Sequence, residues 1–262
     1  MLAEPAPTPY DLRFQLFGTP VRVSPWFWVV MTIFGWDLIN IDFIYVVAWV
    51  VCGFLSILLH EFGHVWAGKA FGSDGYIVLY GLGGLAVGAS SVAGRWRRVV
   101  VYLAGPLIQL AGIWLPLWLW KHNLGDEGWL DLPIQVKVTA IILMEINLYW
   151  PLLNLIPVWP LDGGQVSREV CTGLAPGGGG VRASLIISAA TAGLLAVNAL
   201  VAASNHGVGF LPHVPTGGMF MVLFFGILAV ESFQALNQVP PWQRYDPDDS
   251  VPWEREREPW ER

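Results

Sequence analysis

The sequence predicts an all-α integral membrane protein, with about six transmembrane helices and a small membrane-embedded β-hairpin or sheet between the second and third of them. Two observations support this prediction. Hydrophobic residues make up 55% of the 262-residue chain and charged residues only 13%, a balance typical of membrane proteins. The hydrophobic residues also gather into runs that approach or exceed the roughly 20 residues that a helix needs to cross a bilayer. No basic stripe is present, so the composition does not indicate nucleic-acid binding.

Six hydrophobic runs are candidate membrane spans, and the first is the weakest because Pro25 opens it and Asp37 lies near its end. If the N-terminus is cytoplasmic, twelve Lys and Arg residues fall on the cytoplasmic side and only Lys121 and Lys137 on the other. This asymmetry favours six spans with both termini in the cytoplasm. The runs are residues 25–39, 43–70, 98–120, 134–156, 182–203 and 217–238.

Residues 76–93 differ from both a span and an ordinary loop. The run from Tyr76 to Val87 is apolar, rich in residues that favour strands, and full of glycine. Glycine at this density disfavours a stable helix. We expect a hairpin or re-entrant sheet at membrane depth, where protein or a water-filled cavity must satisfy the backbone; a simple interfacial loop is the alternative. Residues 14–23 also have strand character around a glycine turn.

A metal-binding motif lies inside the second expected span. His60 and His64 are four residues apart, so they share one face of a helix and can hold one zinc ion. Glu61 follows the first histidine and can take a proton from a water molecule at such a metal. In a soluble protein this pattern indicates a zinc peptidase. In a membrane helix it indicates a peptidase that cuts within or beside the bilayer.

A zinc ion with two histidine ligands needs a third protein ligand and an open position. The fourth expected span ends on the same side of the membrane as the two histidines, where Pro157 and Pro160 must interrupt its helix. Asp162 follows, and the two glycines after it allow the backbone to turn. We therefore predict Asp162 as the third ligand. The alternative is that Asp162 caps a helix over residues 163–173.

The rival ligands are less well placed. Glu145 lies nearer the outer leaflet, about 13 Å of helical rise from residue 154. Glu231 lies in the last span without a surrounding motif. The remaining histidines fall on the non-cytoplasmic side: His122, His206 and His213.

Taken together, these motifs resemble the site-2 protease family of intramembrane zinc metalloproteases. The resemblance rests on HEFGH in a membrane helix and on NLIPVWPLDGG, which begins at residue 154 about 100 residues later. The glycine-rich stretch 81–88 and the Ala-Gly-Pro-Leu run at 104–107 are further similarities. The resemblance covers about residues 14–172. The loops are too short for the PDZ or CBS domains of many relatives, so the chain resembles the compact bacterial six-span type related to sporulation-factor processing proteases.

The resemblance implies a role for each motif residue. His60, His64 and Asp162 would bind one Zn²⁺ ion per chain. Glu61 would be the catalytic acid–base residue. Asn154 would be a second catalytic residue that helps bind the scissile carbonyl or its oxyanion.

The resemblance also implies a substrate and its binding strand, with contacts at Gly81, Gly83, Gly84 and Leu85. The substrate would be a membrane-anchored protein, such as a tethered transcription regulator or a signal-peptide remnant, cleaved in or near its transmembrane segment by regulated intramembrane proteolysis. The implied location is the lipid bilayer of a bacterial inner membrane.

We expect one transmembrane metalloprotease domain over residues 1–240, with its catalytic core at about 43–172. We expect residues 241–262 to form a flexible cytoplasmic tail, because their composition cannot build a core. Two other functions stay open at this point: a metal transporter or sensor, and a zinc-binding membrane protein without proteolytic activity.

Overall fold

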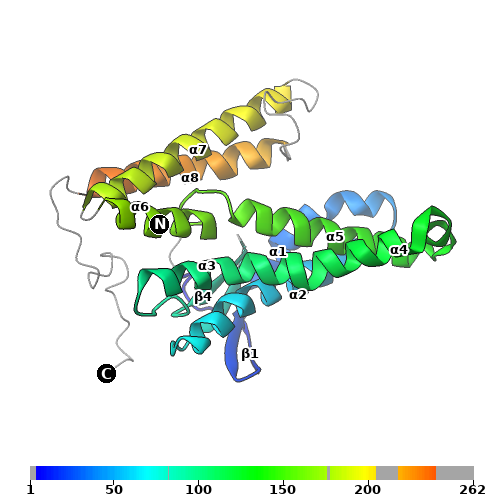
Figure 1. Cartoon of the computed structure of the whole chain (residues 1–262). Helices are drawn as coiled ribbons and strands as arrows, with labels where there is room; N and C mark the ends of the chain where they lie inside the picture. The colour runs from blue at the N-terminus through cyan, green and yellow to red at the C-terminus, as the bar shows by residue number, and fades with distance from the viewer. Residues whose placement is uncertain (1–3, 82, 176–177, 205–217, 240–262) are drawn as a thin grey trace. The chain divides into compact units, whose positions relative to one another are not determined.

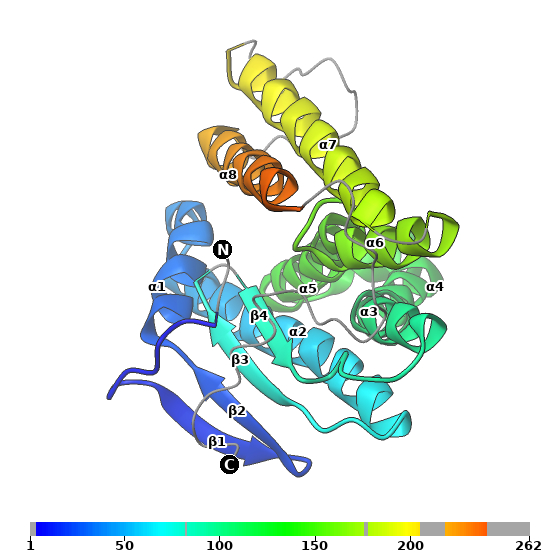
Figure 2. The ribbon, with the colours of Figure 1, turned by 90° about the vertical axis from the view of Figure 1, so that its left-hand side faces the viewer.

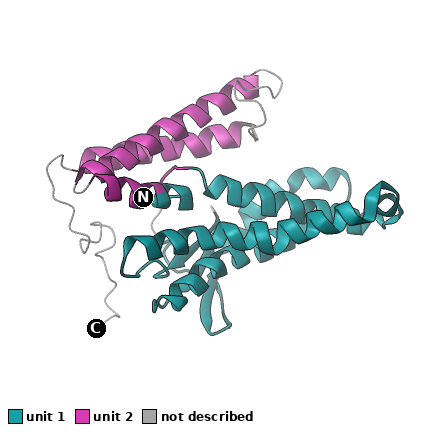
Figure 3. Cartoon of the chain, viewed as in Figure 1, with its two compact units in different colours: residues 1–156, 160–166 teal, residues 157–159, 167–262 magenta. Residues whose placement is uncertain are grey.

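The computed structural model describes residues 4–81, 83–175, 178–204 and 218–239 (Figure 1). The described chain is mainly helical, with a small β-sheet. It divides into two compact units, one of residues 1–156 and 160–166 and the other of residues 157–159 and 167–262 (Figure 3). The expected tail at 241–262 lies outside the described residues.

The first unit contains a four-stranded sheet in the order β1-β2-β3-β4 (Figure 2). The positive φ angles of Phe17 and Gly18 make the tight turn between the first two strands, as two-residue hairpins require. The expected hairpin at 76–87 is present as β3 and β4, which pair antiparallel. The sheet is larger than expected because β2 pairs in parallel with β3. The strands are β1 (Leu12–Leu16), β2 (Thr19–Val23), β3 (Tyr76–Tyr80) and β4 (Gly83–Val87).

Helices α1, η1, α3 and α5 of the first unit contact α2, a helix of 28 residues that carries the HEFGH motif. Apolar side chains of β2 and β3 and of α1 pack with residues of α2 in one hydrophobic core. The helices of this unit are α1 (Pro25–Phe34), the 3-10 helix η1 (Trp36–Asn40), α2 (Phe43–Ala70), α3 (Arg95–Gln109), the π-helical turn η2 (Leu110–Trp114), α4 (Leu115–Asp131) and α5 (Ile134–Asn154).

The π-helical turn η2 joins α3 and α4 into one long apolar segment, which is kinked at Gly125. Pro116 lies just after this turn. A proline inside a regular α-helix lacks an N–H group and collides with the carbonyl four residues earlier. A turn of wider π-helix relieves such a conflict, and these turns often lie beside functional sites.

The second unit is built around α7 (Gly178–Ser204) and α8 (Gly218–Gln238). The hydroxyls of Ser188 and Ser232 lie 2.7 Å apart between these helices. Arg182 donates hydrogen bonds to the carbonyls of Leu236 and Val239 near the end of α8. These bonds tie the two helices together at two levels. The short helix α6 (Asp162–Leu174) begins in the first unit and ends in the second.

Five helices among the described residues are long and apolar enough to cross a membrane. They match the second to sixth expected spans. The first expected span, 25–39, is a ten-residue α-helix followed by a 3-10 helix, so the count of six is not confirmed. The break falls at Gly35, where a Cβ atom would collide with the Trp49 side chain. Gly35 thus permits a close approach to Trp49 at the point where α1 ends.

The contact between α2 and α3 depends on a glycine inside the HEFGH motif. A Cβ atom on Gly63 would lie 2.7 Å from the carbonyl oxygen of Ala104 and 2.9 Å from the Cα atom of Gly105. Both neighbours are backbone, so they cannot move aside as a side chain could. The two helices therefore approach closely only because residue 63 has no side chain.

We predict that Gly63→Ala lowers the free energy of unfolding by about 1–3 kcal/mol, because overpacking forces two backbones apart. Gly193→Ala on α7 is the control, since a Cβ atom at this position would have no neighbour within 4 Å and alanine favours a helix by up to about 1 kcal/mol. Unfolding in detergent, followed by circular dichroism, measures both. Equal stability of the two variants would contradict this description of the α2–α3 contact.

Candidate metal centre

Three potential metal ligands meet in the first unit: His60 and His64 from α2, and Asp162 from the start of α6. The Nε2 atom of His60 lies 3.1 Å from Asp162 Oδ2, and the Nε2 atom of His64 lies 3.4 Å from Asp162 Oδ1. One donor atom from each residue lies within 4.8 Å of the other two. Donors at about 2.0–2.1 Å from a tetrahedral zinc ion are roughly 3.3 Å from one another. The observed spacing therefore fits a zinc site.

The imidazole rings are held so that their Nε2 atoms face the carboxylate. His64 Nδ1 lies 2.7 Å from the Val101 carbonyl oxygen, and His60 Nδ1 lies 2.8 Å from Gln109 Oε1. A carbonyl oxygen only accepts, so His64 carries its proton on Nδ1 when neutral and presents a lone pair at Nε2. When both rings are neutral, their Nε2 lone pairs and the buried carboxylate repel one another, and either a proton or a metal cation between them removes this repulsion. The chemistry of the donor set thus also fits a divalent metal.

Asp162 reaches this position through a break in the chain. Helix α5 ends at Asn154, and α6 begins at Asp162. A Cβ atom on Gly163 would overlap the carbonyl of Leu155 and lie 2.5 Å from that of Ile156. Gly163 therefore allows the start of α6 to lie close to the main chain at residues 155 and 156. The sequence predicted a free turn at Gly163, but the residue lies within a helix.

The carboxyl group of Asp162 is suited to metal binding in its charged form. Burial opposes its ionisation, but positive charge on His64 and hydrogen bonds donated by the His60 and His64 rings outweigh burial and lower its pKa below the ordinary value. Asp162 is the first residue of α6, so it lies where a helix cap would lie, but its carboxylate faces the two imidazoles.

Gly105 on α3 keeps the space beside the donor atoms open. A Cβ atom at this position would overlap the His64 ring and lie 2.9 Å from Nε2 of His60. No other residue type leaves both imidazoles where they are. The glycine of the Ala-Gly-Pro-Leu run is thus part of the wall of the site.

Glu61 lies between the metal centre and the sheet. It is 5% exposed, and the main-chain amide of Ala86 on β4 hydrogen-bonds to its carboxylate. A Cβ atom on Gly84 would overlap this carboxylate. The glycines of β4 therefore let the strand pass directly beside Glu61.

The remaining expected site residues lie near this strand or at the end of α5. Asn154 is the last residue of α5, and its Nδ2 donates to the carbonyl oxygen of Trp150 at 3.0 Å. The other Nδ2 proton is not used in that bond, and the catalytic role of Asn154 stays a prediction. Gly83 packs on Trp150, since a Cβ atom there would lie 2.7 Å from the ring. Gly84 and Leu85 lie in β4, and Gly81 lies just before it.

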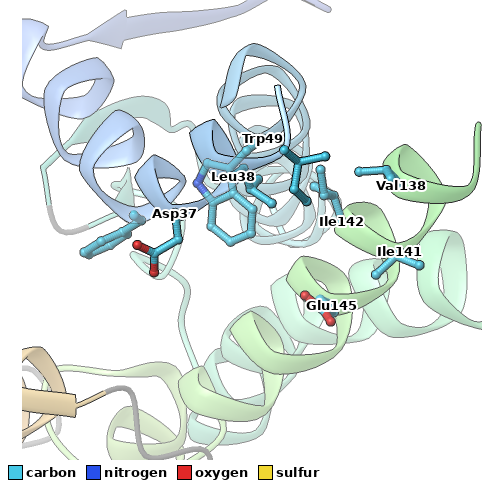
Figure 4. Close-up of a pocket in the computed structure, with 9 residues that line it drawn as sticks. Asp37, Leu38, Trp49, Val138, Ile141, Ile142 and Glu145 are labelled. Atoms are coloured by element: carbon cyan, nitrogen blue, oxygen red, sulfur yellow. The ribbon is translucent and has the colours of Figure 1, made fainter. Parts of the chain in front are cut away.

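The rival ligand Glu145 lines a different cavity of about 390 Å³ together with Asp37 (Figure 4). Both carboxylates lie among apolar neighbours such as Trp49 and Ile142, which come from α2 and α5. His122 stacks on Trp118 in α4. His206 and His213 lie outside the described residues.

Sequence reasoning missed two contributors to the site, Gln109 and Val101. The first carried a signal: Gln109 is a polar residue within an apolar run long enough to span a membrane, and such residues are commonly functional. Val101 acts through its carbonyl, which no side-chain pattern reveals.

Comparisons with known proteins find relatives that are named zinc metalloproteases. The chain is 31% identical over 168 residues to a provisionally named zinc metalloprotease of Synechocystis sp., covering 60% of this chain and 42% of that protein. It is 27% identical over 165 residues to a zinc metalloprotease of Methanocaldococcus jannaschii, covering 62% and 45%. The chain thus spans less than half the length of these curated relatives. No protein-family model matches it.

Among solved structures, the site-2 protease from Methanocaldococcus jannaschii matches with a TM-score of 0.54 at 20% identity, over 90% of this chain and 100% of that one. Fold and site define an integral membrane protein with the site-2 protease fold and a cluster of two histidines and one aspartate that fits a metal. The resemblance to the site-2 protease family is confirmed, by fold and by relatives named zinc metalloproteases.

We predict that Gly105→Ala lowers the zinc content of the purified chain well below that of the wild type, because the added methyl group displaces both imidazoles. Gly112→Ala is the matched control in the same long helix, since its nearest neighbour would be Ile108 Cγ1 at an ordinary 3.8 Å. Metal analysis by mass spectrometry measures both. Full zinc content in Gly105→Ala would show that the wall of the site lies elsewhere.

Proposed function

We propose that this chain is an intramembrane zinc metalloendopeptidase that hydrolyses peptide bonds in or near the transmembrane segments of membrane-anchored proteins. One observation carries the proposal: Glu61 lies buried between a metal-binding group of His60, His64 and Asp162 and the strand β4. A general base, a metal centre and an edge strand are the three parts that cleavage of an extended peptide requires. The names of the relatives support the same activity.

One zinc ion held by His60, His64 and Asp162 would supply a Lewis acid that acidifies water and polarises a peptide carbonyl. Glu61 then accepts the proton of the attacking water and passes it to the leaving amine. Asn154, through the amide proton not bonded to Trp150, donates to the carbonyl oxygen as negative charge develops there.

The substrate binds as an additional strand beside β4. This strand lies at the end of the sheet order, and within the described residues no further strand pairs with its outer edge. An extended peptide can pair there through main-chain hydrogen bonds that do not depend on its side chains. Gly83, Gly84 and Leu85 would form this edge, with Gly81 at its entry, and would bring the peptide past Glu61.

With the run 25–39 counted as a sixth span, the distribution of Lys and Arg supports an orientation with both termini in the cytoplasm, and we place the protein in a bacterial inner membrane. Its substrates would be tethered transcription regulators or signal-peptide remnants, released by regulated intramembrane proteolysis. A metal transporter needs no glutamate beside its first histidine and no strand beside that glutamate. Both features favour the protease over the transporter.

We predict that Glu61→Gln lowers cleavage of membrane-anchored test substrates by at least about 100-fold, because a general base contributes roughly 10²–10⁴-fold. Zinc content should stay at one ion per chain, since the three ligands are unchanged. Glu145→Gln is the matched control, because this residue lines the other cavity and should leave cleavage unaffected. Retained activity in Glu61→Gln would remove this residue from the mechanism, and a wild type that binds zinc without cleaving any substrate would favour the inactive alternative.

A further inference from the structure

We propose that Gln109 is a positioning residue that fixes the proton of His60 on Nδ1 and thereby directs a lone pair from Nε2 toward the metal. The orientation of Gln109 is in turn set by a buried hydrogen-bond network that joins α2, α3 and α5. This inference rests on the proposed metal site and adds a residue that no motif contains.

The network is fully buried. Gln109, Asn147 and Ser56 are each 0% exposed, and His60 is 2% exposed. Gln109 Oε1 lies 2.8 Å from His60 Nδ1, while Gln109 Nε2 donates to the Ser56 carbonyl at 3.1 Å and to Asn147 Oδ1 at 3.2 Å. Asn147 Nδ2 donates to the Ser56 hydroxyl and to the carbonyl of Leu143, both at 2.8 Å. Both polar atoms of each amide are therefore hydrogen-bonded.

Two main-chain carbonyls can only accept hydrogen bonds. They therefore fix which atom donates and which accepts in each bond that the two amides make in this network. If the Asn147 amide were turned over, its oxygen would face the Leu143 carbonyl. If the Gln109 amide were turned over, its oxygen would face the Ser56 carbonyl. Only one arrangement pairs all donors with acceptors, and it presents Gln109 Oε1 to His60. A buried mismatch costs about 1–3 kcal/mol for each unpaired group, so this arrangement dominates.

The orientation of Gln109 determines which ring nitrogen of His60 carries the proton. An oxygen acceptor at Nδ1 requires a proton there, so the neutral ring has its lone pair on Nε2, which faces Asp162 at 3.1 Å. Metal-binding histidines are commonly oriented in this way by an acceptor on their second nitrogen. The main-chain carbonyl of Val101 orients the His64 ring in the same way, by accepting a hydrogen bond from its Nδ1. A substitution can remove the Gln109 acceptor, which is a side chain, but not the Val101 acceptor, which is main chain. Gln109 is therefore the residue at which this arrangement can be tested.

Two substitutions at one position separate positioning from packing. Gln109→Met keeps an unbranched side chain of similar size but removes the acceptor, and we expect the zinc Kd to rise about 10–100-fold. Gln109→Glu keeps an oxygen acceptor for His60 while removing the donor to Ser56 and Asn147. We expect it to lose stability but to bind zinc much more tightly than Gln109→Met. Zinc Kd is measured on the full chain in detergent by chelator competition, and stability by the unfolding midpoint of the metal-free chain.

Ser232→Ala is the control for the loss of a buried hydrogen bond that is not part of the network around Gln109. Ser232 is 0% exposed and lies in the second unit, bonded to Ser188 and to the Leu228 carbonyl. It should lower the unfolding midpoint without changing the zinc Kd. If Gln109→Met does not fold, Asn147→Leu replaces it: this variant removes one acceptor of Gln109 Nε2 but keeps the Ser56 carbonyl, so a smaller rise in Kd is expected.

The outcomes distinguish this inference from the proposed function. If the wild type binds zinc but Gln109→Met binds it equally well, the positioning role is wrong and the protease proposal stands. The same holds if Gln109→Glu binds zinc as weakly as Gln109→Met, because affinity then follows stability. A wild-type chain that binds no zinc would overturn both proposals.

Discussion

The structure of the first unit depends on the meeting of two imidazoles and one carboxylate in a buried space. Such a group needs positive charge between its members, either a metal ion or protons on the imidazoles, and several nearby elements make room for it. The helix that carries His60 and His64 runs through the centre of the unit. The break between α5 and α6 places Asp162 beside the two imidazoles. Gly105 has no side chain that would overlap the ring nitrogens.

The sheet serves a different requirement, which is to bring extended backbone next to Glu61. A β-strand at membrane depth needs its backbone polar groups satisfied, and β4 meets part of this need by pairing with β3 and by the bond from Ala86 to Glu61. Gly84 permits this contact because any side chain would displace the carboxylate. Gly84 on β4 therefore allows the sheet to lie close to Glu61, and Gly105 on α3 allows that helix to lie close to the two histidine ligands.

Much of this arrangement could be predicted from local patterns. The spacing of His60 and His64 defines a helix face, the two prolines before Asp162 require a break, and the glycine-rich run indicates strands. What the sequence hid was non-local. The parallel pairing of β2 with β3 joins residues more than 50 positions apart. The apolar run 25–39 looked long enough to span but divides at Gly35, which lies against Trp49 of another helix. The role of Gln109 was hidden for the same reason, because its partners come from two other helices.

Zinc K-edge X-ray absorption spectroscopy on the purified chain tests the metal centre most directly. We expect about one zinc ion per chain with only nitrogen and oxygen donors at about 2.0–2.1 Å, including the scattering of two imidazoles. Loss of one of the two imidazole contributions in His60→Ala would identify His60 as a zinc ligand. A sulfur donor at about 2.3 Å, or a spectrum that is unchanged when Asp162 and both histidines are replaced, would contradict a centre built from these three side chains.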